Sequence, residues 1–214
     1  MSNSGDSFHF LAVAGNIGAG KSALTGLLAK HFGWNAYYES VDNNPYLSDF
    51  YEDMRRWSFN LQIYFLSSRF RSQRQMLKEA RSFIQDRTIY EDVEIFARNL
   101  YEMGLMSKRD YDNYSALFNE MTAFLQPPNL LVYLKAEVPT LVRQIEKRGR
   151  DYENSISIDY LKRLNALYED WIDRYPYEKL IIETDELDFV NNREDLGKII
   201  SMIEQRQFGL FSER

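Results

Sequence analysis

One stretch of the chain decides its fold: Gly15-Asn16-Ile17-Gly18-Ala19-Gly20-Lys21-Ser22. It fits the pattern G-x-x-x-x-G-K-[ST], in which glycines let backbone N–H groups turn inward around the oxygens of a phosphate. The apolar run at 8–14 is typical of a buried strand, and residues 21–31 follow a helical pattern. A strand, a glycine-rich loop and a helix in this order predict a site for the phosphates of a nucleoside triphosphate. There Lys21 would reach the terminal phosphates, and Ser22 would offer its hydroxyl to Mg²⁺.

Short apolar runs alternate with longer helical patterns along the rest of the chain. The sequence predicts further strands at 34–39, 82–86, 130–134 and 180–184, and helices at 57–80, 93–102, 108–124, 139–147, 159–175 and 193–205. Pro139 suits the first turn of its helix, and Asn192 suits an N-cap. Such alternation implies right-handed crossovers and a parallel sheet that is covered on both faces. We therefore predict one α/β domain over residues 1–214, with a doubly wound five-stranded parallel sheet flanked by helices and ligands at the carboxyl ends of its strands.

Composition excludes several other classes of protein. The 214 residues include no cysteine, which rules out disulfides, Cys–zinc sites, iron–sulfur clusters and thiol nucleophiles. Acidic residues outnumber basic ones by 32 to 26, so nucleic acid is not an expected partner. No run approaches the roughly 18 apolar residues that a membrane span needs. Residues 1–7 are polar, unlike a secretory signal, and we expect them to be flexible. These features predict a cytoplasmic enzyme without a membrane partner.

Charged residues follow two further predicted strands. Glu39 ends the second strand, where a carboxylate can accept the proton of a hydroxyl group that receives a phosphoryl group. Asp86 ends the third strand and can bind Mg²⁺ directly or through water. The adjacent Arg87 can stabilise charge near the transferred group. The alternative is that these are solvated residues at strand ends, and for Glu39 the sequence does not decide between the two.

Two helices carry further candidate residues. Arg143, Arg148 and Arg150 lie at a helix end around a glycine and indicate an arginine-bearing lid over about residues 143–155. The alternative is a basic helix end that interacts with its own dipole. In the long helix, Gln62 and Arg69 are two turns apart and project to the same side. A glutamine amide can pair with a nucleobase edge, and Asp92 is a candidate partner for Arg69, although polar residues of such a helix also commonly face water.

Taken together, these residues resemble the deoxynucleoside kinase family, and specifically its bacterial deoxyadenosine/deoxyguanosine kinase branch. The resemblance runs from the phosphate loop to Phe189. Its most specific stretches are Asn43-Asn44-Pro45-Tyr46-Leu47 with Phe50-Tyr51, Arg56-Trp57-Ser58-Phe59-Asn60-Leu61-Gln62, and Asp86-Arg87-Thr88-Ile89-Tyr90 with Phe96-Ala97. The resemblance implies a P-loop kinase fold and ATP-dependent phosphorylation of the 5′-hydroxyl of a deoxynucleoside, a purine one, in nucleotide salvage.

The same resemblance implies roles for individual residues. On the acceptor side it makes Glu39 the general base, places Arg87 beside the 5′-oxygen and places Asp86 near Mg²⁺. It implies nucleoside contacts from Gln62, from the Arg69–Asp92 pair, from Phe96 as a stacking ring, and from Tyr51 with Glu153 at the 3′-hydroxyl. On the donor side it implies ATP contacts from residues 15–22, Arg148, Arg150, Asp188 and Phe189. Relatives in this family are commonly dimers packed through helices, so a homodimer is expected.

The chain departs from the family pattern at three places. Glu39-Ser40-Val41 stands where many relatives have Glu-Pro-Val, and Thr88 replaces a serine. Gln144 occupies the place of the helical lid arginine, and Arg143 stands one residue earlier. Because one residue rotates a helical side chain by about 100°, we expect Arg143 to be the least dependable of the lid arginines.

Two other functions compete with this interpretation. A nucleoside monophosphate kinase of the thymidylate kinase type shares the phosphate loop and an Asp-Arg pair, but the Glu39 carboxylate would repel its anionic acceptor. A non-catalytic P-loop switch would bind nucleotide and signal by ordering a loop, which leaves Gln62, Arg69 and Asp92 without a purpose. The sequence does not rank adenine against guanine, nor does it exclude deoxycytidine as a substrate.

Overall fold

The computed structural model describes residues 8–38, 44–79, 81–150 and 156–208. Within these residues, five strands form one sheet in the order β2-β3-β1-β4-β5, and all neighbouring strands are parallel. The strands are β1 (Phe10–Gly15), β2 (Asn35–Tyr37), β3 (Phe83–Asp86), β4 (Leu130–Lys135) and β5 (Lys179–Glu183). The predicted five-stranded parallel sheet is therefore confirmed. The flexibility expected for residues 1–7 concerns a segment that lies outside the described residues.

Helices connect the strands, and most of them lie where the sequence predicts, although α2 was not predicted. They are α1 (Lys21–Phe32), α2 (Leu47–Glu52), α3 (Met54–Glu79), α4 (Ile89–Glu91), the π-helical segment η1 (Asp92–Ala97), α5 (Arg98–Glu102), α6 (Lys108–Thr122), α7 (Val138–Arg148), α8 (Ile158–Arg174) and α9 (Arg193–Phe208). Pro139 lies in the first turn of α7, and the Asn192 side chain accepts the N–H of Glu194 at the start of α9, as predicted. None of the helices in the described ranges has the length and apolar character needed to cross a membrane.

The helix predicted to begin at residue 93 begins earlier, at Ile89. Thr88 and Glu91 form a reciprocal capping box: the Thr88 side chain accepts a backbone N–H, and the Glu91 carboxylate accepts the N–H of Thr88. This cap starts the helix four residues before the predicted boundary. The helix then widens into η1, whose π-type hydrogen bonds leave no signature in hydrophobic periodicity.

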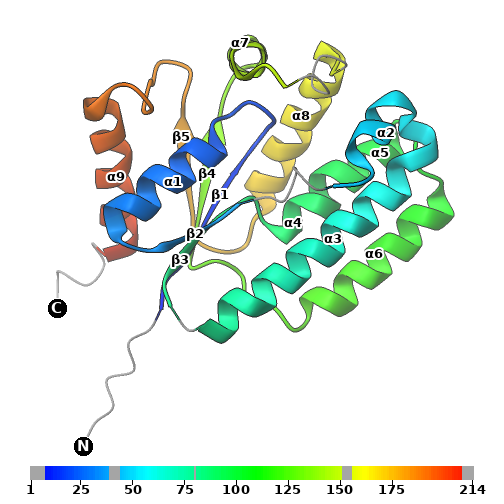
Figure 1. The fold of residues 1–214 in the computed structure, drawn as a ribbon, viewed down its shortest axis with the longest axis horizontal. Helices are drawn as coiled ribbons and strands as arrows, with labels where there is room; N and C mark the ends of the chain where they lie inside the picture. Colours follow the sequence, from blue (N-terminus) through cyan, green and yellow to red (C-terminus); the bar gives the residue numbers. More distant parts are fainter. Residues whose placement is uncertain (1–7, 39–43, 80, 151–155, 209–214) are drawn as a thin grey trace, which may run out of the picture.

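Side chains of the sheet alternate between two hydrophobic cores. Leu11 and Val13 of β1 pack on one face with α1 and α9, whereas Phe10 and Ala12 pack on the opposite face with α8. Figure 1 shows this arrangement, with α1 and α9 on one side of the sheet and α8 on the other. Burial on both faces explains why the strands read as near-continuous apolar runs.

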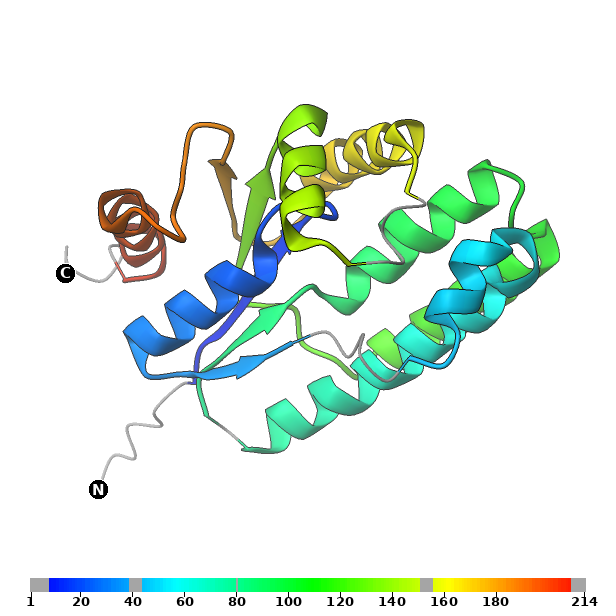
Figure 2. The ribbon, with the colours of Figure 1, turned by 45° about the horizontal axis from the view of Figure 1, so that its top comes forward.

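A third core lies beside the sheet and is built from helices. It joins α2, α3, α6 and the helices that follow β3, with Leu66, Leu100 and Tyr114 among its fully buried members. Helices α3 and α6 run side by side in both ribbon views (Figures 1 and 2). The sheet and this helical layer therefore form two regions, and the ends of β1 and β3 lie where they meet.

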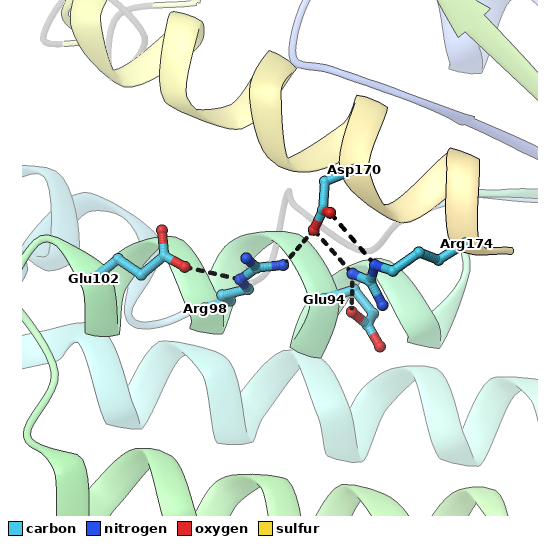
Figure 3. A network of polar contacts seen from close by, with 5 residues as sticks. All are labelled: Glu94, Arg98, Glu102, Asp170 and Arg174. Carbon is cyan, nitrogen blue, oxygen red and sulfur yellow. Dashed lines mark hydrogen bonds and ion pairs between the residues drawn. The ribbon is translucent and has the colours of Figure 1, made fainter.

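An ionic network on the surface links α8 to η1 and α5 (Figure 3). Arg98 Nη1 is 2.6 Å from Asp170 Oδ2, and Arg98 Nε is 2.8 Å from Glu102 Oε1. Arg174 Nη2 lies 3.0 Å from Asp170 Oδ2 and 3.4 Å from Glu94 Oε2. Hydrogen bonds from Arg174 and then Arg98 hold the pKa of Asp170 below its ordinary value. Asp170 is thus the shared acceptor of the network.

We expect Asp170→Asn to remove an acid-sensitive part of the stability. Because the pKa of Asp170 is lower in the folded state, its contribution is complete above the unfolded pKa of about 3.9 and is lost as pH falls through the folded pKa. The side chains are largely exposed, so the contribution at pH 7 is about 1 kcal/mol or less, or roughly 3 °C in Tm. The Tm values of the wild type and the variant, measured from pH 7 to pH 3, should begin to converge only below about pH 4. Asp173→Asn, an exposed change on the same helix, should run parallel to wild type.

Candidate active site

The phosphate loop joins the end of β1 to the start of α1 with little spare room. Gly20 has φ of 90° as the N-cap residue of α1, and Gly15 has φ of 152° at the end of β1. A Cβ atom on Gly15 would lie 2.9 Å from the backbone oxygen of Leu134, and one on Gly20 would lie 2.8 Å from Phe189 Cζ. Both positions therefore require glycine for backbone conformation and for space.

Lys21 is the first residue of α1 and is almost fully buried. Its Nζ donates a hydrogen bond to the backbone oxygen of Asn16, at 3.0 Å. The ammonium group is thus held over the loop to which it belongs, on the side where the loop borders a cavity. A positive charge in this place can meet the phosphates of a nucleotide.

The turn after β3 places Arg87 in the same cavity. Arg87 has φ of +66°, the one positive value among the described non-glycine residues. Its N–H donates to Val13 O at 2.9 Å, and the N–H of Thr88 donates to Glu91 Oε2 at 2.6 Å. A left-handed backbone costs an L-residue about 1–2 kcal/mol, so these bonds on either side hold an unfavourable conformation. The guanidinium carbon lies 4.2 Å from the ring centroid of Phe96.

Ser22 and Asp86 meet between α1 and β3. The Ser22 hydroxyl donates to Asp86 Oδ2. Asp86 is 3% exposed, and its Oδ1 accepts no hydrogen bond from any described residue. A buried carboxylate oxygen with spare capacity beside a hydroxyl suits a hard cation such as Mg²⁺. In the described ranges no group of three or more His, Asp or Glu residues is placed to hold a metal ion.

A cavity of about 270 Å³ brings the predicted acceptor residues together. It lies between the phosphate loop, the turn after β3, and helices α2 and α3. The sequence-predicted residues along its wall are Ile17, Lys21, Ser22, Tyr51, Gln62, Asp86, Arg87, Asp92, Phe96, Arg148 and Arg150. Residues to which the sequence assigned no role in the site also line the cavity: Tyr38, Leu47, Phe50, Leu61, Phe65 and Tyr160. The cavity therefore has charged groups near the phosphate loop and apolar walls from α2 and α3.

Arg69 and Asp92 form the ion pair that the sequence suggested. Arg69 Nε lies 2.9 Å from Asp92 Oδ1 and 2.8 Å from Oδ2, and the side chains are 6% and 2% exposed. Asp92 lines the 270 Å³ cavity, whereas Arg69 lies behind it and borders a smaller hollow with Gln85. The arginine thus orients the carboxylate without being part of the cavity wall.

A second cavity, of about 390 Å³, opens on the other side of the phosphate loop. Gly18 and Gly20 line it together with Asp188 and Phe189, and the Phe189 ring lies against Gly20. Arg148 and Arg150 border both cavities and so stand between them. Arg143 borders neither described cavity: its Nη2 donates to Thr140 Oγ1 at 2.9 Å, and Gln144 lines the second cavity instead. At this part of α7 it is therefore Gln144, and not Arg143, that lines the 390 Å³ cavity.

Three comparisons agree on the family. The sequence profile of the deoxynucleoside kinase family matches residues 11–207. The chain belongs to the deoxynucleoside kinase family. It is 42% identical over 198 residues to the deoxyadenosine/deoxycytidine kinase of Bacillus subtilis, which covers 90% of each chain. It is 38% identical over 215 residues to a deoxyguanosine kinase of Lactobacillus johnsonii, covering 95% of each.

Solved structures are similar to this deoxynucleoside kinase along nearly the whole chain. A deoxyadenosine kinase from M. mycoides with bound dATP superposes with a TM-score of 0.81 at 28% identity, covering 92% of this chain and 99% of that one. The same enzyme with the products dCMP and a flexible dCDP gives a TM-score of 0.82 at 29% identity, over the same shares of the two chains. The protein is an enzyme that phosphorylates deoxynucleosides, and these findings do not favour the monophosphate kinase or the switch.

Two predicted residues of the kinase lie outside the described residues. They are Glu39, the predicted base, and Glu153, predicted to contact the 3′-hydroxyl. Residues 151–155 of the predicted lid are outside as well. Their roles stay predictions, and the last described residue before Glu39 is Tyr38, which lines the 270 Å³ cavity.

The structure also places residues that sequence reasoning missed. Glu91 is fully buried and accepts hydrogen bonds from the Tyr168 hydroxyl at 2.8 Å and from the N–H of Thr88. Burial, followed by the charge of Glu91, raises the pKa of Tyr168 well above its ordinary value, so the phenol stays a donor at neutral pH. The spacing Thr88-x-x-Glu91 is a capping-box pattern, and that signal could have drawn attention to Glu91.

Proposed function

We propose that this kinase transfers the terminal phosphoryl group of ATP to the 5′-hydroxyl of a purine deoxynucleoside. The observation that carries the proposal is the 270 Å³ cavity, where Lys21 and Arg87 share one wall with Gln62 and Asp92. Positive groups that bind phosphates thus lie within one cavity of polar groups that suit a base. The relatives named above act on deoxyadenosine, deoxyguanosine or deoxycytidine, and we extend the purine part of that range to this chain.

On the donor side, ATP would occupy the phosphate loop and the 390 Å³ cavity, with its adenine bordered by Asp188 and Phe189. The N–H groups of residues 15–22 and Lys21 would bind its phosphates. Arg148 and Arg150 border both cavities, which supports a lid over about residues 143–155 that closes on the phosphates. Water excluded by such a lid could not compete with the acceptor hydroxyl.

Ser22 and Asp86 would hold Mg²⁺, because their contact leaves a buried carboxylate oxygen with spare capacity. When bound, the ion would neutralise charge on the phosphates of ATP. Arg87 would donate to the oxygens near the 5′ position, a direction fixed by its left-handed backbone. Glu39 would accept the proton that the 5′-hydroxyl releases.

On the nucleoside side, Gln62 and Asp92 would read the base. Gln62 is 3% exposed and lines the cavity, so its amide has both a donor and an acceptor to offer. The Asp92 carboxylate, oriented by Arg69, would accept an N–H from a purine edge. Phe96 would supply a stacking face, and Tyr51 with Glu153 would bind the 3′-hydroxyl. We further propose that residues 1–214 form one domain, which works in the cytoplasm as a homodimer in nucleotide salvage.

We expect deoxyadenosine or deoxyguanosine to outcompete thymidine by roughly tenfold or more in kcat/KM, because Asp92, which Arg69 holds against the cavity, leaves little room for a 5-methyl pyrimidine. The measurement is ATP consumption with each of the four deoxynucleosides and without any of them. A preference for thymidine would contradict the base assignment. Consumption that requires a deoxynucleoside monophosphate would favour the monophosphate kinase, and slow hydrolysis without any acceptor would favour the switch.

A further inference from the structure

The side chain of Asn16 is bound inside the protein although it occupies a variable position of the phosphate-loop pattern. It is 2% exposed. Its Nδ2 donates to the backbone oxygen of Leu161 at 3.0 Å and to Asn165 Oδ1 at 2.5 Å, and its Oδ1 accepts the N–H of Ile17 at 2.7 Å. The side-chain amide thus uses both its donor and its acceptor to fix the first turn of the loop against α8.

Asn165 has a second partner on the opposite side. Its Nδ2 donates to the backbone oxygen of Ala136 at 2.9 Å. Ala136 lies between β4 and α7 and lines the 390 Å³ cavity. One half-buried amide of α8 therefore bridges the two walls of the proposed ATP site: its oxygen contacts the phosphate loop, and its nitrogen contacts the β4–α7 connection.

The bridge also reaches the lysine. The backbone oxygen of Asn16 accepts the hydrogen bond from Lys21 Nζ at 3.0 Å. The side-chain hydrogen bonds of Asn16 fix the orientation of its peptide group. The peptide oxygen in turn helps to set the position of the Lys21 ammonium group. Asn16 Nδ2 also donates to the backbone oxygen of Leu161. A substitution at Asn165 therefore removes one of the two hydrogen bonds from Asn16 to α8 and leaves the other in place.

We infer that Asn165 is a positioning residue for the phosphoryl donor. It keeps the phosphate loop and the β4–α7 connection at a fixed spacing and, through Asn16, orients Lys21. The inference rests on the proposed function in taking ATP as the occupant of that site. It concerns the donor alone, because none of the contacts of Asn165 reaches Gln62, Asp92 or Phe96.

The test uses Asn165→Ala and Asn165→Asp in the full-length enzyme. We expect Asn165→Ala to weaken ATP binding by about tenfold, measured by calorimetry without acceptor and as KM for ATP, while KM for the deoxynucleoside changes less than about twofold. Asn165→Asp keeps the acceptor for Asn16 but loses the donor to Ala136, so it should behave like the alanine variant. Arg163→Ala, an exposed change on the same helix, is the control and should bind ATP as the wild type does.

A double-mutant cycle with Asn16→Ala separates positioning from general stability. Because replacing Asn16 already breaks the bridge at one end, the double variant should bind ATP no more weakly than Asn16→Ala alone. The inference is overturned if Asn165→Ala lowers Tm but leaves ATP affinity within twofold, if it raises both KM values equally, or if Asn165→Asp binds ATP like the wild type. If the wild type binds ATP but phosphorylates no deoxynucleoside, the proposed function fails, while weakened ATP binding by Asn165→Ala would still support the inference.

Discussion

Turnover of a deoxynucleoside should fall about a hundred- to ten-thousand-fold when Glu39 is replaced by glutamine. We propose that this carboxylate takes the proton from the 5′-hydroxyl while the oxygen attacks phosphorus, and an amide of the same shape cannot do so. Substrate binding should be nearly unchanged, since the size of the side chain is kept. The preceding residue, Tyr38, lines the same cavity as Arg87.

Single-turnover assays with saturating ATP and deoxynucleoside measure this loss, and equilibrium titration checks that binding survives. Glu52→Gln is a matched control, because Glu52 is exposed at the end of α2 and should tolerate the change. If Glu39→Gln kept more than a tenth of wild-type turnover, Glu39 would not be the base.

The second large effect concerns the buried ion pair. Asp92→Ala should lower the free energy of unfolding by about 3–5 kcal/mol, because it leaves the Arg69 guanidinium buried without its carboxylate. Urea unfolding at neutral pH measures the change. The double replacement Arg69→Met with Asp92→Ala should recover most of the loss, since it removes the buried guanidinium together with the carboxylate it was paired with.

Asp112→Ala provides the comparison for this experiment. Lys108 Nζ and Asp112 Oδ2 are as close, at 2.7 Å, but the two side chains are 73% and 56% exposed. Because solvent screens an exposed ion pair, breaking this one should change the free energy of unfolding far less than breaking the buried pair. A loss for Asp92→Ala no greater than the loss for Asp112→Ala would mean that burial of the Arg69–Asp92 pair does not contribute as we argue.

The sheet could be predicted because its strands carry local signals. Each of the five is a short apolar run next to a glycine, a proline or an acid, and the order of strands and helices then limits the topology. The boundaries were less accurate where capping decides them. Strand β2 begins at Asn35 and not at Trp34 as predicted. Trp34 follows the end of α1, and its N–H donates a hydrogen bond back to Ala29 O in that helix. Helix α2 was missed because six residues give too short a period to recognise.

In the candidate site too, residues with a local sequence signal could be predicted, and residues whose partners lie far away in the chain could not. The phosphate loop is recognisable because its glycines meet a local backbone requirement, and Arg69 with Asp92 could be paired by charge. Glu91 and Asn165 were missed because their partners are distant in the chain: Tyr168 is 77 residues from Glu91, and Asn16 is 149 residues from Asn165. The positive φ of Arg87 also has no sequence signal, since neighbouring segments impose it.

The two-part construction of the molecule separates two kinds of evolutionary freedom. The proposed ATP site follows the ends of β1 and β4, whereas Leu61, Gln62 and Phe65 belong to α3, a helix whose hydrophobic support lies outside the sheet. Substitutions of these α3 side chains can therefore change which deoxynucleoside binds without altering the site for the phosphoryl donor. A lineage of such enzymes can diversify its substrates by remodelling one layer while inheriting the other intact.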